Sequence, residues 1–166
     1  MNLGDKLAKL RNHYCPPFDL QDPLITVTSL EINDMLYAQL PSYRGFGGTL
    51  DNKGVFRLPL DGVYWLPSLD DMGRIIAWDW VDKKEYRVEM FDCENFAFWF
   101  KARVDGVFKL NNVAMVIDYS GGHGYNLFLT SDAKILLFEP QTDFYWFLGD
   151  HDFKGAYKLE LAWLLL

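Results

Sequence analysis

The sequence predicts an α+β fold, in which a central helix that carries a cysteine packs on an antiparallel sheet that carries a histidine and a glutamate. Three observations predict it. Helical patterns occupy residues 1–40, an amphipathic pattern begins at residue 92, and three strand-like segments follow between residues 112 and 140. Helices that precede a run of antiparallel strands are typical of the α+β class.

The first fifty residues are expected to support this arrangement. Two amphipathic helices are predicted, the second over 29–40, each ended by prolines. The side chains that we expect to turn inward are Leu3, Leu7, Leu10, Leu30, Met35, Leu36 and Leu40. Segments 54–59 and 62–67 each stop at a proline and are predicted as edge strands, and 157–166 is expected to return to the sheet.

Cys93 is predicted to begin the central helix. Asp92 is a good N-cap residue, and Gly106 is a plausible end. The side chains that form one helical face are Cys93, Phe96, Ala97, Phe100 and Val104. The first helical residue lies among backbone N–H groups that have no partner within the helix, so we expect this position to favour the thiolate. The alternative is a buried cysteine that acts as a small core residue.

His123 and Glu139 fall on two strand patterns joined by a polar turn. If the hairpin loop has three residues, Leu129 lies opposite Ala133 and His123 lies opposite Glu139, close enough for a hydrogen bond. A loop longer or shorter by one residue would place the two on opposite faces. The alternative is a surface histidine and a solvated glutamate at the end of a strand.

Three motifs around these residues resemble the papain-like C-terminal domain of the Marasmius oreades agglutinin and related phage-encoded proteins. They read Asp-Cys-Glu-Asn-Phe-Ala from 92, Gly-His-Gly-Tyr-Asn-Leu from 122 and Phe-Glu-Pro-Gln-Thr-Asp from 138. The resemblance is strong over 91–149 and implies a papain-like cysteine hydrolase fold with the triad Cys93, His123 and Glu139. Gly124, where that family usually has alanine, is a small departure.

The resemblance also bears on ligands. The agglutinin carries a sugar-binding β-trefoil ahead of this domain, and this chain is too short for one, so lectin activity is not expected to carry over. The agglutinin domain depends on calcium, and Asp92, Glu94 and Asp143 are weak candidates to bind it because calcium prefers oxygen ligands. Asp92 as a helix cap and Glu94 as a solvated charge of the first turn are also explained without a metal.

The chemistry implied by the triad is nucleophilic catalysis. His123 would take the thiol proton, Glu139 would orient the ring, and Cys93 would attack a carbonyl to form a thioester. The backbone N–H of Cys93 is the natural first oxyanion donor. The second donor is not identified: Arg87 stands where papain-type enzymes have a glutamine, which leaves the indoles of Trp78 or Trp80 as candidates.

Composition narrows the class of protein. The 166 residues with a net charge of −7 predict a single domain over 1–166 with no basic surface for nucleic acid. We expect no membrane span, no signal peptide and synthesis in the cytoplasm, and the phage relatives make a virion component conceivable. Two cysteines, Cys15 and Cys93, do not form a disulfide framework. Oligomeric state is not predicted.

Three classes of function fit the sequence. The first is a cysteine peptidase or amide hydrolase acting on a peptide or protein substrate. The second is a transglutaminase-like acyl transferase that uses the same triad and an amine acceptor. The third is a non-catalytic structural or carbohydrate-binding protein, which could use exposed indoles at Trp65, Trp78, Trp80 or Trp146.

Overall fold

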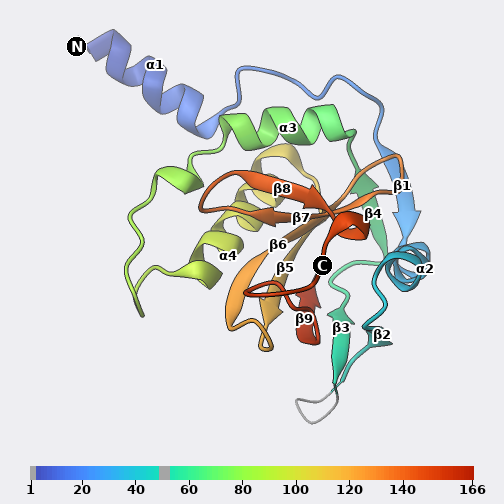
Figure 1. The fold of residues 1–166 in the computed structure, drawn as a ribbon. Coiled ribbons are helices and arrows are strands. Elements are labelled where there is room, and N and C mark those ends of the chain that lie inside the picture. The colour runs from blue at the N-terminus through green and yellow to red at the C-terminus, as the bar shows by residue number, and fades with distance from the viewer. Residues whose placement is uncertain (1–2, 49–52) are drawn as a thin grey trace.

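A computed structural model describes residues 3–48 and 53–166 of the chain. Its main helices are α1 (Leu3–Tyr14), α2 (Ser29–Gln39), α3 (Leu69–Trp78) and α4 (Cys93–Arg103), with short helical turns at Val81–Lys83, Val104–Phe108 and Leu148–Asp150. Its strands are β1 (Ile25–Thr28), β2 (Tyr43–Phe46), β3 (Gly54–Leu58), β4 (Val63–Leu66), β5 (Val113–Asp118), β6 (His123–Leu129), β7 (Ile135–Glu139), β8 (Phe144–Phe147) and β9 (Leu161–Leu165). The predicted α+β class is confirmed (Figure 1).

The main sheet is mixed, whereas the sequence predicted an antiparallel one. Its order is β2-β3-β9-β5-β6-β7-β8. Strand β3 runs parallel to both β2 and β9, while the pairs β9–β5, β5–β6, β6–β7 and β7–β8 are antiparallel. The prediction of an edge strand at 54–59 is therefore wrong: the ladder ends at Leu58, so Pro59 does not interrupt it. The predicted return of the C-terminus to the sheet is confirmed by β9, and β4 pairs only with β1, in a separate two-stranded sheet.

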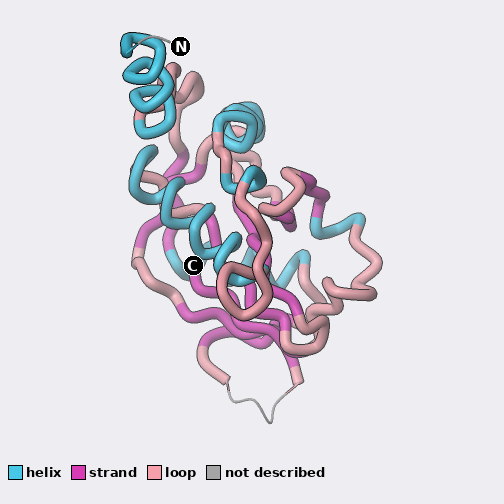
Figure 2. The backbone as a smooth tube through the Cα atoms, turned by 90° about the vertical axis from the view of Figure 1, so that its left-hand side faces the viewer, coloured by secondary structure: helices cyan, strands magenta, loops and turns pink. Residues whose placement is uncertain are grey.

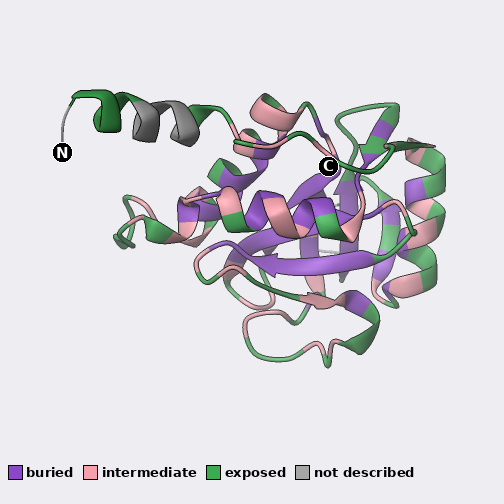
Figure 3. Ribbon diagram, turned by 90° about the horizontal axis from the view of Figure 1, so that it is seen from above, coloured by how far each residue is buried: buried purple, intermediate pink, exposed green. Residues whose placement is uncertain are grey.

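Two apolar cores lie on opposite faces of the main sheet. One joins α2 to alternate residues of the strands, such as Val116 and Leu127, and the other joins α3 and α4 to Val113, Phe128 and Phe138. Figure 1 shows α2 and α4 on opposite sides of the strands, and Figure 3 shows burial concentrated in the sheet between them. Cys93 therefore belongs to a helix held on one face by a well-packed core.

The N-terminal helices contribute less to the core than the sequence predicted. Leu36 of α2 and Leu40, which caps its C-terminus, are buried as expected, but Leu30 is exposed and Ile32 takes the inward position. In α1, Leu3 and Leu7 are both exposed, since the helix projects from the body of the molecule (Figure 1, Figure 2). The side chain of Leu10 lies outside the described part.

The central helix begins at Cys93 with Asp92 as its N-cap, as predicted. It ends later than expected, because a π-helical turn, Val104–Phe108, carries it past Gly106. Lys109 ends it in the left-handed conformation at φ 59°, and its Nζ donates to the Gly106 carbonyl at 2.7 Å. Among the described helices, none is long and apolar enough to cross a membrane.

Candidate active site

Cys93 is held against β6 by a close approach of two backbones. The Gly124 N–H donates to Cys93 Sγ at 3.3 Å. A Cβ atom at position 124 would lie 2.8 Å from the Cα and 2.9 Å from the N of Glu94, a contact that real Cβ atoms do not make. Gly124 is thus what lets the start of α4 come close enough to β6 for this bond to form. Both cysteines, Cys15 and Cys93, are free.

The β6–β7 hairpin brings His123 and Glu139 together by a register that differs from the predicted one. Leu129 lies opposite Ile135, not Ala133, so the predicted register is wrong by two residues. Five residues, 130–134, connect the two strands instead of three, and the Thr130 N–H donates to the Lys134 carbonyl at 3.1 Å across this loop. A shift of two residues leaves every side chain on the same face.

The consequence is a direct contact between the two side chains. His123 Nε2 lies 2.6 Å from Glu139 Oε2 although the residues are diagonal, not directly opposed, across the hairpin. Since the carboxylate oxygen accepts, Nε2 carries the hydrogen and Nδ1 is the nitrogen left to accept a proton.

Glu139 is fixed by two further residues that sequence reasoning missed. The Tyr157 hydroxyl donates to Oε2 at 2.8 Å, while the backbone N–H and the side-chain amide of Gln141 donate to Oε1, each at 3.2 Å. Burial opposes the negative charge, but the hydrogen bonds from His123, Tyr157 and Gln141 outweigh it and hold the pKa of Glu139 below its ordinary value. The carboxylate is therefore ionised at neutral pH.

Tyr157 reaches the site because the C-terminal segment is anchored to the β5–β6 turn. The buried carboxylate of Asp118 accepts from the Leu159 N–H at 2.9 Å, and Ser120 Oγ accepts from the Glu160 N–H at 3.0 Å. These bonds join residues about forty positions apart, and no local pattern in the sequence indicates them. The Tyr157 ring then packs edge-on against the ring of His123, with centroids 5.4 Å apart.

His123 and Cys93 line one cavity of about 310 Å³. Glu94, Met115, Ile117, Tyr119 and Gly122 line it as well. The imidazole is held between Tyr125 and Tyr157, so its orientation is set by packing as well as by Glu139. The three residues predicted as catalytic thus converge on one place in the fold.

The environment of the thiol differs from the predicted one. Burial raises the pKa of Cys93, the bond from the Gly124 N–H opposes this, and the Glu94 carboxylate, 3.6 Å from Sγ, raises the pKa further. The start of a helix was expected to favour the thiolate, but burial and an adjacent negative charge outweigh it. Ionisation of Cys93 therefore depends on a proton acceptor beside it.

The predicted second oxyanion donors lie elsewhere. Trp80 packs against Trp99 with ring centroids 5.8 Å apart, Trp78 packs against Phe108 at 5.4 Å, and neither is among the described residues that line the Cys93 cavity. Arg87 is occupied by Glu85 at 2.6 Å. Cys93 is the first residue of α4, so its backbone N–H has no acceptor within the helix.

The three carboxylates suggested for calcium do not form a shared site. Asp92 accepts from the Glu89 N–H at 3.0 Å, and Glu94 faces the thiol. The pKa of Asp143 is raised to about 6, first by burial and then by the nearby charges of Asp82 and Asp79. Within residues 3–48 and 53–166, no group of three or more His, Cys, Asp or Glu side chains is arranged to hold a metal ion. The arrangement of Asp92, Glu94 and Asp143 does not fit a calcium ion, so calcium binding is implied by the resemblance alone.

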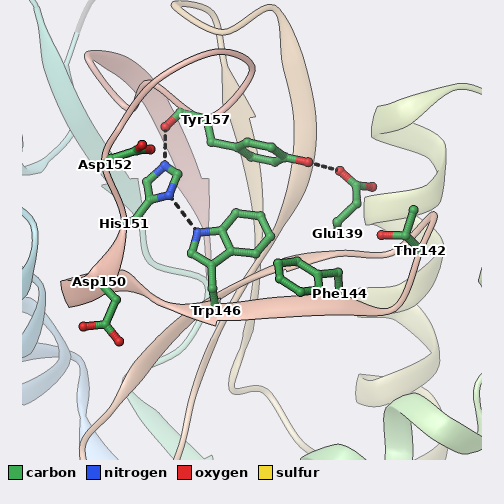
Figure 4. Close-up of a pocket in the computed structure, with 8 residues that line it drawn as sticks. All are labelled: Glu139, Thr142, Phe144, Trp146, Asp150, His151, Asp152 and Tyr157. Carbon is green, nitrogen blue, oxygen red and sulfur yellow. Dashed lines mark hydrogen bonds between the residues drawn. The ribbon is translucent and has the colours of Figure 1, made fainter.

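Glu139 also lines a second cavity, of about 550 Å³ (Figure 4). Aromatic and acidic side chains line it: Phe144, Trp146, Tyr157, Asp150 and Asp152, together with Glu139, Thr142 and His151. Trp146 Nε1 donates to His151 Nδ1 at 2.9 Å, and His151 Nε2 donates to the Tyr157 carbonyl at 2.8 Å. The Trp146 indole is therefore held by His151, which in turn is bonded to the backbone of Tyr157.

The fold and the site together define an α+β protein with a thiol, an imidazole and a carboxylate gathered at a helix–hairpin junction. Comparison with solved structures finds the same fold in the PSL1a–E64 complex, with a TM-score of 0.58 and 24% identity over 85% of this chain. Polyporus squamosus lectin bound to a human-type influenza-binding epitope matches with a TM-score of 0.57, 24% identity and 85% coverage. No family model and no curated protein matches the sequence.

The likeness to these lectins concerns the fold. It agrees with the resemblance to the agglutinin family noted from the sequence. The chain spans about half the length of each of the two solved structures, 50% of one and 49% of the other.

Proposed function

We propose that the chain is a cysteine-dependent amide hydrolase of papain-like architecture, with Cys93 as nucleophile, His123 as general base and Glu139 as the group that orients the imidazole. One observation carries the proposal: Glu139 binds Nε2 of His123 at 2.6 Å, and the imidazole lines the same cavity as Cys93 Sγ. This arrangement leaves Nδ1 as the proton acceptor, as nucleophilic catalysis by a thiol requires.

The proposed reaction has two stages. Nδ1 of His123 takes the thiol proton while Cys93 Sγ bonds to the carbonyl carbon of the substrate, and the backbone N–H of Cys93 stabilises the oxyanion. The C–N bond then breaks, and the imidazolium returns its proton to the departing amine, leaving a thioester. Water attacks the thioester with His123 again as base, which releases the carboxylic acid and restores the thiol. An amine in place of water would make the reaction an acyl transfer.

Thiol reactivity tests the proposal without a known substrate. Alkylation of Cys93 by iodoacetamide is followed against pH in the wild type, His123→Ala and Glu139→Ala, with Cys15→Ser to remove the other thiol. We expect fast alkylation below the ordinary cysteine pKa of about 8.5, lost in His123→Ala. Equal, slow alkylation of Cys93 in every form would overturn the proposal. Once an amide substrate is found, products formed with and without added amine separate hydrolysis from acyl transfer.

Carbohydrate binding is the second candidate, favoured by the two lectin structures and by the cavity around Trp146 (Figure 4). The rings of Phe144 and Trp146 lie 5.4 Å apart and 31° from parallel. Aromatic faces can cover the apolar side of a sugar ring, and the carboxylates of Asp150 and Asp152 can accept from its hydroxyl groups. The sugar epitope is bound by Polyporus squamosus lectin, a protein about twice as long as this chain, so this function needs its own test.

A glycan array followed by fluorescence titration provides that test. Binding should be lost in Trp146→Ala and kept in Trp65→Ala, which removes an exposed indole on another strand. Because Trp146 also packs against a core, Asp150→Asn serves as a second variant at an exposed position. If no glycan binds the wild type, or if Trp146→Ala and Asp150→Asn both bind like it, the candidate fails.

A further inference from the structure

The second cavity is lined by aromatic rings that the protein does not cover completely (Figure 4). Phe144 and Trp146 lie on one face of β8, since side chains alternate along a strand, and Tyr157 comes from the C-terminal segment. Phe144 is 63% exposed, and Trp146 and Tyr157 are partly exposed. The volume of about 550 Å³ is typical of a small-molecule site.

The three rings are set at different angles. The rings of Trp146 and Tyr157 are 80° from parallel with centroids 4.9 Å apart, whereas Phe144 is 31° from parallel to Trp146. The face of an aromatic ring carries partial negative charge and attracts a cation. Rings that border one cavity at different angles can surround a cationic group, as they do in proteins that recognise quaternary ammonium ligands.

The charged side chains of the cavity have the sign that favours a cation. Among the described residues that line it, Glu139, Asp150 and Asp152 are acidic, and none is a lysine or an arginine. Lys154 pairs with Asp152 and offsets one of these carboxylates. Glu139 and Asp150 keep the cavity negative, in a chain whose net charge is −7.

His151 does not reverse this sign, because its hydrogen bonds require a neutral ring. The indole Nε1 of Trp146 can only donate, so Nδ1 of His151 accepts. Nε2 then carries the one ring hydrogen and donates it to the Tyr157 carbonyl. The imidazole therefore contributes no positive charge to the cavity.

Most polar groups of the lining already have partners, and this selects the kind of cation. Glu139 accepts hydrogen bonds from His123, Tyr157 and Gln141, and Asp152 is engaged by its lysine. A primary ammonium has three N–H donors and loses hydrogen bonds to water when too few acceptors replace them. A quaternary ammonium has no N–H group, so it needs only the ring faces and the negative charge.

We infer that this cavity binds an organic cation with a quaternary ammonium head, which lies against the rings of Phe144, Trp146 and Tyr157. The site does not require Cys93 to react, so the inference goes beyond the proposed hydrolysis and is tested separately from it. A sugar is the competing occupant of the same cavity, and the experiment below distinguishes the two.

Choline and its uncharged isostere 3,3-dimethyl-1-butanol test the inference. The two molecules have nearly the same shape, but a carbon atom replaces the charged nitrogen in the alcohol. Each is titrated into the wild type and followed by tryptophan fluorescence, with sodium chloride at the concentration of the choline chloride as the control for ionic strength. We expect choline to bind about tenfold more tightly than the alcohol.

Two variants link this preference to the cavity. Phe144→Leu keeps an apolar side chain but removes a ring face, and Asp150→Asn removes a negative charge at an exposed position. Each should weaken choline binding about threefold and change binding of the alcohol less. The matched controls are Phe98→Leu, at 64% exposure on α4, and Asp70→Asn, at an exposed position of α3; both helices pack on the other face of the sheet from Trp146, and neither variant should alter choline binding.

Two results would overturn the inference. One is choline binding that is no tighter than binding of the alcohol, or that is unaffected by both Phe144→Leu and Asp150→Asn. The other is a neutral glycan whose binding depends on Trp146 and is not displaced by choline, which would leave carbohydrate as the occupant. Both results are independent of the iodoacetamide rates of Cys93, which test the proposed hydrolysis.

Discussion

The surroundings of Glu139 favour its ionised form, whereas the surroundings of Cys93, at the other end of the candidate site, disfavour the thiolate. Both oxygens of Glu139 accept hydrogen bonds, from His123, Tyr157 and Gln141, and these outweigh burial and lower its pKa. The thiol of Cys93 has one backbone donor and a neighbouring carboxylate, and burial raises its pKa.

The difference teaches which part of the site is preorganised. The imidazole and its carboxylate are fixed before any ligand arrives, so His123 can accept a proton in a defined direction. The thiol depends on that acceptor, because its own surroundings disfavour the thiolate. Changes at the thiol end should therefore alter reactivity most, while changes at the carboxylate end should appear first in stability and its pH dependence.

The largest effect is expected from Gly124→Ala. The new Cβ would lie 2.8 Å from the Glu94 Cα, so the start of α4 must move and the bond from the residue 124 N–H to Cys93 Sγ must lengthen. Overpacking of this kind costs about 1–3 kcal/mol of stability, and we expect Cys93 alkylation at neutral pH to slow by about tenfold. Urea unfolding and iodoacetamide kinetics measure the two effects. Gly106→Ala, where a Cβ meets nothing within 4 Å, is the control. Wild-type behaviour of Gly124→Ala would show that the close approach is unimportant.

Glu94→Gln should act in the opposite direction at the same end. Removing a negative charge 3.6 Å from Sγ favours the thiolate, so the pKa of Cys93 falls and alkylation at pH 7 becomes about threefold faster, the scale of an exposed charge interaction. The difference should shrink at high salt. Asp34→Asn is the control: it changes the net charge equally at an exposed position of α2, which packs on the sheet face opposite to α4. An unchanged or slower rate in Glu94→Gln would contradict the electrostatic account.

Tyr157→Phe tests the carboxylate end. Loss of the hydroxyl that donates to Glu139 should lower the free energy of unfolding by about 1 kcal/mol at neutral pH. The folded pKa of Glu139 lies below its unfolded value of about 4.3, so the stability linked to its charge is present above that value and is lost as pH falls through the folded pKa. The deficit of the variant should therefore shrink in acid.

Denaturant unfolding at pH 7 and at pH 3 measures this deficit. Tyr145→Phe, on the adjacent strand β8, is the matched control and should cost less at pH 7. An equal deficit for Tyr157→Phe at both pH values would mean that the tyrosine contributes packing alone.

Much of this comparison follows from local sequence patterns. The periodicity of one helix places Cys93 at its first position, and the alternation of two strands places His123 and Glu139 on one face. The predicted register is wrong by two residues because a five-residue loop cannot be told from a three-residue loop by composition. The shared face survives the error, since the period of a strand is two.

What the sequence did not predict depends on contacts between distant segments. The internal position of β3 requires that β9, about a hundred residues later, pair parallel to it. Tyr157 reaches Glu139 only through bonds from the C-terminal segment to Asp118 and Ser120. The raised pKa of Cys93 follows from burial and from where the Glu94 carboxylate points. None of these three features is indicated by a periodicity or a residue spacing in the sequence.

The smallest effect concerns two acids four residues apart, Glu139 and Asp143, whose pKa values shift in opposite directions. Within the described part of the chain, no hydrogen bond to the Asp143 carboxylate offsets its burial, and burial and the charges of Asp82 and Asp79 raise its pKa to about 6. A raised carboxyl pKa means that the folded protein holds the proton more tightly than the unfolded chain, so stability falls as pH rises from about 4 through about 6. Asp143→Asn removes this loss, and asparagine tolerates the φ of 59° at this position.

Because Asp143 is partly exposed, solvent screens the charge and the gain should be below about 1 kcal/mol. Thermal unfolding should show Asp143→Asn more stable than the wild type at pH 8 and equal to it at pH 4. Asp132→Asn is the opposite control: hydrogen bonds from Lys134 and Thr130 lower the pKa of Asp132, so this change should destabilise at pH 8. A gain for Asp143→Asn that is the same at both pH values would show that the acid does not titrate in this window. In that case burial would not disfavour the charged form of Asp143, and this carboxylate would no longer contrast with Glu139, whose charged form is stabilised by hydrogen bonds.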